Sequence, residues 1–355
     1  MDKTERLAGF LPDEGDAALV LTPANRRYLT GFPSSAGWLV VSRRGAWFFT
    51  DFRYIEAAKR RVKGAECRMF TRAADSLTAL FAATGIQRVF VENGLTLGEF
   101  DALRRDIPGV DWRSGPELDG WIGSLRLCKS PEELSLIRQA QAFTEYGFEH
   151  ILPFIRAGRT EREVALELEF LVRKQGAEGT AFDFIVVSGP NSSLPHGVPG
   201  DRQLQPGDFV TMDFGAMVDG WRSDMTRTVA VGRISDEQRR VYDTVLRAQE
   251  ACLSVLRAGL PCVEGDRAAR DIIDGAGYAG CFGHGTGHGV GVDIHEEPRL
   301  SPSAGAALLQ ADSVVTVEPG IYLEGRFGVR IEDMVRITPD GCENLTHAPK
   351  ELLCL

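Results

Sequence analysis

Long apolar runs and paired cysteines are both missing from this 355-residue sequence. No stretch approaches the roughly 18 apolar residues of a membrane-spanning helix, and the first residues lack the apolar run of a signal peptide. The seven cysteines are odd in number and none has Cys-X-X-Cys spacing, which argues against a disulfide framework or a thiolate zinc site. We therefore expect a cytoplasmic protein without a membrane partner.

Positive charge is not in excess either. The 40 Lys and Arg residues are outnumbered by 50 Asp and Glu residues, which gives a formal net charge of −10. Such a balance argues against nucleic acid or an anionic membrane as the main partner. At about 100–200 residues per domain, the length suggests two domains.

The first third of the chain alternates strand-like and helix-like segments. Strands are expected at 17–22, 37–42, 46–50 and 88–93, and helices at 52–62 and 95–107. This alternation predicts an α/β domain over residues 1–122. A stretch rich in Gly, Pro, Asp and Trp, residues 108–123, is the expected linker.

The rest of the chain, residues 123–355, carries strong helix-start signals. Ser130, Thr160 and Ser235 each precede Glu or Gln by three residues, which is the capping-box pattern. Strands are expected at 184–189, 209–215, 225–232, 313–319 and 329–337. Helices followed by paired strands indicate an α+β domain with an antiparallel sheet.

Two acids share one face of a predicted hairpin. Asp219-Gly220 is a strong two-residue turn signal, and a turn there puts Asp224 opposite Gly215. Because side chains alternate between the faces of a strand, Asp213 and Asp224 are expected on the same face. Two such acids repel each other unless a cation or a proton stabilises them; the alternative is a solvated polar face.

A second predicted hairpin, VVTVEPGIYLEGRFGVRIEDMV, repeats this arrangement. Pairing Leu323 with Val329 places Glu332 opposite Gly320. Glu318 is then two residues away on the same face. Two hairpins with the same geometry favour a shared ligand for the four acids over two solvated faces.

Three of the six histidines, His284, His288 and His295, lie in one Gly-rich string, HGTGHGVGVDIHEEP, and His196 lies in a separate loop. Four carboxylates with an imidazole favour divalent ions such as Mn²⁺, Co²⁺, Fe²⁺ or Zn²⁺. Four negative charges match two such ions, about 3.5–4 Å apart, better than one. Paired ions lower the pKa of water, which equips a site to hydrolyse an amide.

The order of these residues resembles the pita-bread metallopeptidases, which include methionine aminopeptidase, aminopeptidase P and prolidase. The strings HGTGHGVGVDIHEEP, VEPGIY and GVRIED are similar to the aminopeptidase P and prolidase branch, and ANRRYLTGFPSSAGWLVV is similar to its N-terminal domain. The resemblance implies a pita-bread catalytic domain at 123–355 after a smaller creatinase-like α/β domain at 1–122. It also implies a homodimer.

The resemblance implies a role for each metal ligand. Asp213 would bind one ion, and Asp224 and Glu332 would bridge both ions. His288 and Glu318 would complete the set of ligands around the second ion. Mn²⁺ or Co²⁺ are the ions that we expect first, with Zn²⁺ or Fe²⁺ as alternatives.

Further roles concern the substrate. His196 and His295 resemble histidines that contact the scissile amide, and Glu318 would also serve as general base. His284 resembles a family histidine near the part of the substrate that leaves after cleavage. Arg299 resembles an arginine that binds the carboxylate of proline; the alternative for Arg299 is a solvated side chain at a loop edge.

Several neighbours are expected to have supporting roles. Thr226 would contact the carboxylates without binding a metal itself, and Arg330 would orient Glu332 or a neighbouring acid. Tyr322 could line the site, although an aromatic residue on a strand is more often a packing residue. Glu296 is expected to be structural.

The implied reaction is hydrolysis of the bond between an N-terminal residue and proline. A dipeptidase gains by binding the free carboxylate of proline, and an aminopeptidase acting on longer peptides is the alternative. Two further alternatives share the fold: a metal-free creatinase-like hydrolase, which lacks the five ligands, and a non-enzymatic binding protein, which typically loses them.

Overall fold

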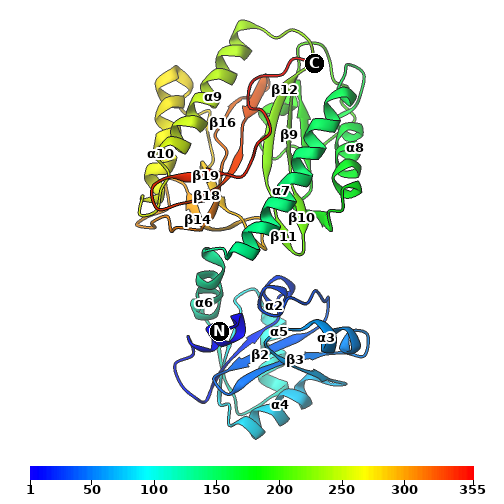
Figure 1. Ribbon diagram of the computed structural model, residues 1–355, viewed down its shortest axis with the longest axis vertical. Coiled ribbons are helices and arrows are strands. Elements are labelled where there is room, and N and C mark those ends of the chain that lie inside the picture. Colours follow the sequence, from blue (N-terminus) through cyan, green and yellow to red (C-terminus); the bar gives the residue numbers. More distant parts are fainter. The chain divides into compact units, whose positions relative to one another are not determined.

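The computed structural model describes residues 1–355, which divide into two compact units, residues 1–126 and residues 127–355. Both units are mixtures of helices and strands (Figure 1). None of the helices combines the length and the apolar character that crossing a membrane requires.

The N-terminal unit is built on one six-stranded sheet in the order β4-β3-β2-β1-β5-β6 (Figure 1). Its elements are α1 (Lys3–Ala8), β1 (Asp16–Val20), α2 (Pro23–Thr30), β2 (Trp38–Ser42), β3 (Gly45–Thr50), α3 (Ile55–Arg61), β4 (Glu66–Met69), α4 (Ala73–Thr84), β5 (Arg88–Val91), α5 (Leu97–Asp106), β6 (Asp111–Ser114) and α6 (Pro116–Leu127). Strand β1 pairs antiparallel with β2 and parallel with β5. The expected α/β architecture is confirmed.

The linker expected at residues 108–123 is wrong, because this stretch forms β6 and most of α6. Strand β6 lies at the edge of the sheet, and three of its four side chains are exposed. An edge strand carries little of the apolar pattern by which a buried strand is recognised. Its polar composition therefore looks like that of a loop.

The C-terminal unit contains the capped helices that the sequence predicts. Its elements are α7 (Pro131–Ile151), η1 (Leu152–Phe154), α8 (Glu161–Lys174), β7 (Gly179–Thr180), β8 (Ile185–Ser188), η2 (Gly189–Ser193), β9 (Phe209–Phe214), β10 (Ala216–Val218), β11 (Trp221–Arg222), β12 (Met225–Ala230), α9 (Asp236–Val255), α10 (Cys262–Ile273), η3 (Asp274–Tyr278), β13 (Gly287–Gly289), β14 (Glu296–Leu300), β15 (Val314–Val317), β16 (Gly320–Leu323), β17 (Phe327–Arg330), β18 (Asp333–Ile337) and β19 (Cys342–Asn344). Ser130, Thr160 and Ser235 each form the complete capping box at the start of α7, α8 and α9.

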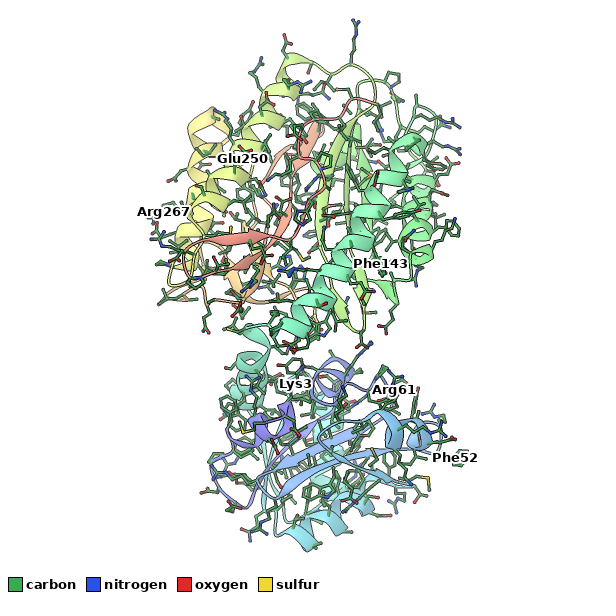
Figure 2. The ribbon with its side chains drawn as sticks, in the orientation of Figure 1. Lys3, Phe52, Arg61, Phe143, Glu250 and Arg267 are labelled. Carbon is green, nitrogen blue, oxygen red and sulfur yellow. The ribbon has the colours of Figure 1, made fainter.

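Antiparallel strands fill the middle of this unit, between two pairs of helices (Figure 1). Helices α7 and α8 share one apolar core with β8, β9 and β12, in which Phe148, Leu168 and Met212 are buried. Helices α9 and α10 share another core with β15–β18. Their outer faces carry charged side chains such as Glu250 and Arg267 (Figure 2). This is the α+β arrangement expected for the catalytic domain.

The register of the first hairpin is confirmed. Val218 pairs with Trp221 across the Asp219-Gly220 turn, and Asp213 pairs with Thr226 in the same register farther along. This register puts Asp224 opposite Gly215, as predicted.

The register of the second hairpin differs from the prediction by two residues. Leu323 pairs with Phe327, not Val329, because the loop is only three residues long and Gly325 adopts a positive φ of 67° within it. The strand expected at 329–337 also breaks between β17 and β18. Glu318 and Glu332 lie at this break, where Pro319 cannot donate a ladder hydrogen bond.

Candidate metal centre

A cavity of about 600 Å³ opens in the C-terminal unit. It is lined by all nine side chains that the sequence predicts for the site: His196, Asp213, Asp224, His284, His288, His295, Arg299, Glu318 and Glu332. The structure therefore brings together the residues that the sequence assigns to one site, and their roles remain predictions.

The ligand-type side chains sit at strand ends and at breaks between ladders. Asp213 lies near the end of β9, Asp224 directly before β12, Glu318 directly after β15 and Glu332 directly before β18. His288 is the middle residue of β13. At Gly287 an added Cβ would lie 1.9 Å from the backbone oxygen of Thr316, so only glycine lets β13 approach β15 this closely.

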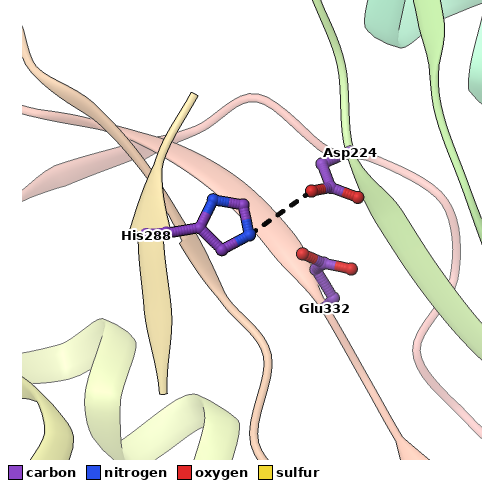
Figure 3. Close-up of side chains that lie close together, drawn as sticks. All are labelled: Asp224, His288 and Glu332. Carbon is purple, nitrogen blue, oxygen red and sulfur yellow. Dashed lines mark ion pairs between the residues drawn. The ribbon is translucent and has the colours of Figure 1, made fainter. Parts of the chain in front are cut away.

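Asp224, His288 and Glu332 form the centre of the cluster (Figure 3). One ligand atom from each lies within 4.8 Å of the other two. Nε2 of His288 is 3.6 Å from Oδ2 of Asp224 and 3.3 Å from Oε1 of Glu318. Nδ1 of His288 donates to the carbonyl of Gly289 at 3.1 Å, which leaves the Nε2 lone pair facing the carboxylates.

Three of the carboxylates have an oxygen that nothing in the protein satisfies. Oδ1 of Asp213, Oδ1 of Asp224 and Oε1 of Glu332 are buried and make no hydrogen bond. Burial, and then the neighbouring carboxylates, raise the pKa of Asp224 and of Glu332 well above the ordinary value. Unpartnered buried carboxylate oxygens are costly, and a divalent cation satisfies them. The donor set therefore fits metal ions.

Hydrogen bonds and an ion pair with neighbouring side chains hold two of the acids in position. Thr226 donates to Oε2 of Glu332 at 2.7 Å, as its expected supporting role requires. Arg330, only 3% exposed, forms an ion pair with Asp213 at 2.6 Å and donates to the hydroxyl of Thr226 at 3.1 Å. Arg330 thus orients a neighbouring acid, and that acid is Asp213.

Tyr322 is more than a packing residue. Its hydroxyl accepts from Arg330 at 2.9 Å and lies 2.8 Å from Nε2 of His284. Burial raises the pKa of Tyr322 to about 12, so the phenol stays protonated. Tyr322 therefore fixes the orientation of His284 in the cavity wall.

The neutral imidazole is favoured at His284 and His295. Burial lowers the pKa of His284 and of His295. The ring of His295 is 4.4 Å, centroid to centroid, from the ring of His288. Arg299 lies in β14 opposite His288 in β13, on the same wall of the cavity.

Glu296 is structural, as expected. Its side chain is buried and forms an ion pair with Lys129 at 3.3 Å, and it accepts a hydrogen bond from the backbone of Asp293 at 3.1 Å. These contacts hold the segment that precedes β14, next to His295.

Several lining residues were not singled out from the sequence, and three of them lie together. Phe182, Asp183 and Ile185 form part of the cavity wall at the start of β8. The string FDFIVV looks like an ordinary buried strand, and no motif marks its first residues. Only the tertiary structure brings them to the predicted metal ligands.

The chain matches the model of Metallopeptidase family M24 over residues 135–339. This chain belongs to metallopeptidase family M24. Residues 5–128 match the Creatinase/Prolidase N-terminal domain, so the predicted family and its two-domain architecture are confirmed.

Relatives of this M24 peptidase match along the whole chain. It is similar to the Xaa-Pro dipeptidase from Bacillus anthracis, with 41% identity, 99% of each chain covered and a TM-score of 0.94. It is also similar to the X-Pro aminopeptidase from Thermotoga maritima, with 36% identity, full coverage of both chains and a TM-score of 0.92. The Xaa-Pro dipeptidase of Pyrococcus horikoshii is 33% identical over 99% of each chain.

Proposed function

We propose that this M24 peptidase hydrolyses the bond between an N-terminal residue and proline in dipeptides and short peptides. The observation that carries the proposal is the convergence of five ligand-type side chains, three with unsatisfied buried oxygens, in one cavity. The relatives named as Xaa-Pro peptidases supply the substrate class.

The metals are proposed to be two divalent ions, Mn²⁺ or Co²⁺ before Zn²⁺ or Fe²⁺. Asp213, Asp224, His288, Glu318 and Glu332 would hold them, because their four negative charges balance two divalent cations. When bound, such a pair supplies Lewis acidity and lowers the pKa of water to give a nucleophile at neutral pH. A metal-free creatinase-like reaction would leave the buried acids uncompensated.

The side chains of the protein contribute the rest of the reaction. Glu318 would accept the proton released by the nucleophile. His196 and His295 would donate N–H groups to the carbonyl oxygen as negative charge develops on it. His284, held by Tyr322, would act near the leaving side.

Arg299 favours a dipeptide as substrate. It lines the cavity and makes no hydrogen bond or ion pair with the protein, so its guanidinium is available for a ligand. A carboxylate matches its fork bidentately, and the proline of a dipeptide carries a free carboxylate.

Aminopeptidase activity on longer Xaa-Pro peptides is the second candidate. The observation that favours it is the similarity to the X-Pro aminopeptidase from Thermotoga maritima at a TM-score of 0.92. We also propose that the protein is a cytoplasmic homodimer, for which light scattering in solution would give twice the mass of the chain.

Turnover of matched peptides tests the proposal. After loading with Mn²⁺, the enzyme is expected to cleave Ala-Pro-Ala and Ala-Pro but not Ala-Ala-Ala, and to favour Ala-Pro. Equal rates on Ala-Pro-Ala and Ala-Ala-Ala would remove the proline assignment. A preference for Ala-Pro-Ala over Ala-Pro would select the aminopeptidase.

A further inference from the structure

The cavity contains one carboxylate that neither the metal ligands nor the supporting hydrogen bonds use. Five acids and two arginines line it: Asp183, Asp213, Asp224, Glu318, Glu332, Arg299 and Arg330. Four of the acids are the proposed metal ligands, and Arg330 is already paired with Asp213 at 2.6 Å. Asp183 and Arg299 are left, and neither makes a hydrogen bond or ion pair in the protein.

The basic residues near Asp183 form ion pairs with other acids. Asp183 is exposed and also lines a smaller hollow beside α8, whose lining includes Arg162 and Arg173. Arg162 pairs with Asp201 at 3.1 Å, and Arg173 pairs with Glu169 at 2.7 Å. The charge of Asp183 is therefore open to a ligand in the cavity.

Asp183 and Arg299 belong to opposite walls of the metal centre. Asp183 precedes β8, whose Ile185 pairs with Asp213 on β9. Arg299 pairs with His288, on the other side of the ligand cluster. A dipeptide with its carboxylate at Arg299 and its amide at the metals would therefore direct its first residue toward Asp183.

The wall around Asp183 suits a long side chain with a charged end. Phe182 and Ile185, both half-buried, flank Asp183 and offer apolar surface. Lys and Arg side chains bury their aliphatic stems on such surface and keep the charged end at a polar group. The cavity of about 600 Å³ has room for such a residue beside proline.

We propose that Asp183 is a specificity-determining residue that selects substrates with Lys or Arg as the first residue. The inference rests on the proposed Xaa-Pro hydrolysis and names a preference within it. Asp183 attracts the cationic end of the side chain, while Phe182 and Ile185 contact its stem.

The test compares Lys-Pro with norleucine-Pro, whose first residue has the same apolar stem without the charge. In the Mn²⁺-loaded enzyme we expect kcat/KM to be about five- to tenfold higher for Lys-Pro, the range of a charge pair between exposed and partly desolvated groups. Asp183→Asn should abolish this ratio and leave norleucine-Pro within about twofold of the original enzyme. Asp183→Glu should retain the ratio.

Asp340→Asn is the matched control, because Asp340 is an exposed aspartate of the same unit that does not line the cavity and should leave the ratio unchanged. Binding gives a second readout: free lysine should inhibit norleucine-Pro cleavage more strongly than norleucine does, and Asp183→Asn should remove the difference. If Asp183→Asn leaves the ratio unaltered, or lowers both substrates equally, the proposal is overturned. Failure to cleave either dipeptide would instead overturn the proposed Xaa-Pro activity.

Discussion

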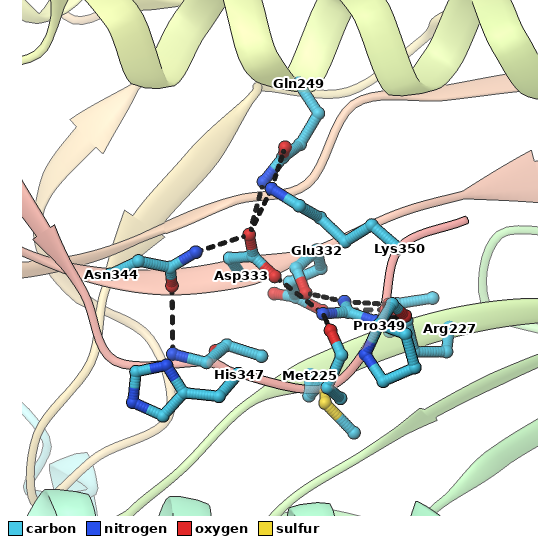
Figure 4. A network of polar contacts seen from close by, with 12 residues as sticks. Met225, Arg227, Gln249, Glu332, Asp333, Asn344, His347, Pro349 and Lys350 are labelled. Atoms are coloured by element: carbon cyan, nitrogen blue, oxygen red, sulfur yellow. Dashed lines mark hydrogen bonds and ion pairs between the residues drawn. The ribbon is translucent and has the colours of Figure 1, made fainter.

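Arg227 should be one of the most sensitive positions in the C-terminal unit, although it touches no substrate. Its side chain is 1% exposed, and its guanidinium donates to four backbone carbonyl groups, one of them that of Glu332 (Figure 4). It also forms an ion pair with Asp333 at 2.8 Å. Arg227→Met keeps the length of the side chain but removes all of these contacts.

The magnitude follows from the burial of the pair. Asp333 is completely buried, and its second oxygen accepts from Gln249, Asn344 and Lys350 at 2.9 Å each. Lys350 still pairs with Asp333 in this variant, but four carbonyl oxygens and one oxygen of Asp333 lose their donor, and breaking a buried pair of this kind costs about 3–5 kcal/mol. At about 2–4 °C per kcal/mol for a unit of this size, Arg227→Met should lower the Tm by about 6–20 °C.

Thermal unfolding of the metal-free protein, followed by circular dichroism, measures this effect without the stabilisation that bound metal adds. Arg326→Met is the matched control: Arg326 pairs with Glu237 at the surface, its side chain is 54% exposed, and its loss should cost at most about 1 kcal/mol. A Tm shift for Arg227→Met no larger than that for Arg326→Met would refute the reasoning.

Three further predictions concern the site itself. Asp224→Asn should retain the fold but lose nearly all activity, since the proposed bridge between the ions is broken; full activity in the presence of a strong chelator would contradict this. His288→Ala should lower bound metal, as measured by mass spectrometry, whereas His295→Ala should keep the metal and lose about 10²–10³-fold in turnover; the reverse pattern would exchange the two roles. Arg299→Ala should raise KM for Ala-Pro at least about tenfold and affect Ala-Pro-Ala less, because about 1.5–3 kcal/mol of charge-assisted hydrogen bonding is lost; equal effects on both peptides would remove the argument for a dipeptidase.

Much of the catalytic unit follows from local sequence signals. The capping boxes at Ser130, Thr160 and Ser235 start helices because the side-chain and backbone groups that satisfy each other lie within four residues. The Asp219-Gly220 turn fixes its own register, since a two-residue loop leaves no freedom in pairing. At these helix starts and at this turn, groups close together in the sequence determine the structure.

Other features depend on groups that are distant in the sequence. The register of the second hairpin differs from the prediction by two residues, because its three-residue loop is shorter than the pairing of Leu323 with Val329 requires. Arg330 was expected to orient Glu332 or a neighbouring acid, and only the packing of β17 shows that this acid is Asp213. Asp183 carries no motif at all and reaches the cavity only through the pairing of β8 with β9.

The number of ions that activity requires tests the proposed two-metal centre most directly. Metal-free enzyme would be titrated with Mn²⁺ while Ala-Pro turnover and bound manganese are measured on the same samples. We expect turnover to reach its plateau at about two bound ions per chain, because the four clustered carboxylates carry more negative charge than one divalent cation balances. Full turnover at one bound ion per chain, or without any bound metal, would contradict the account.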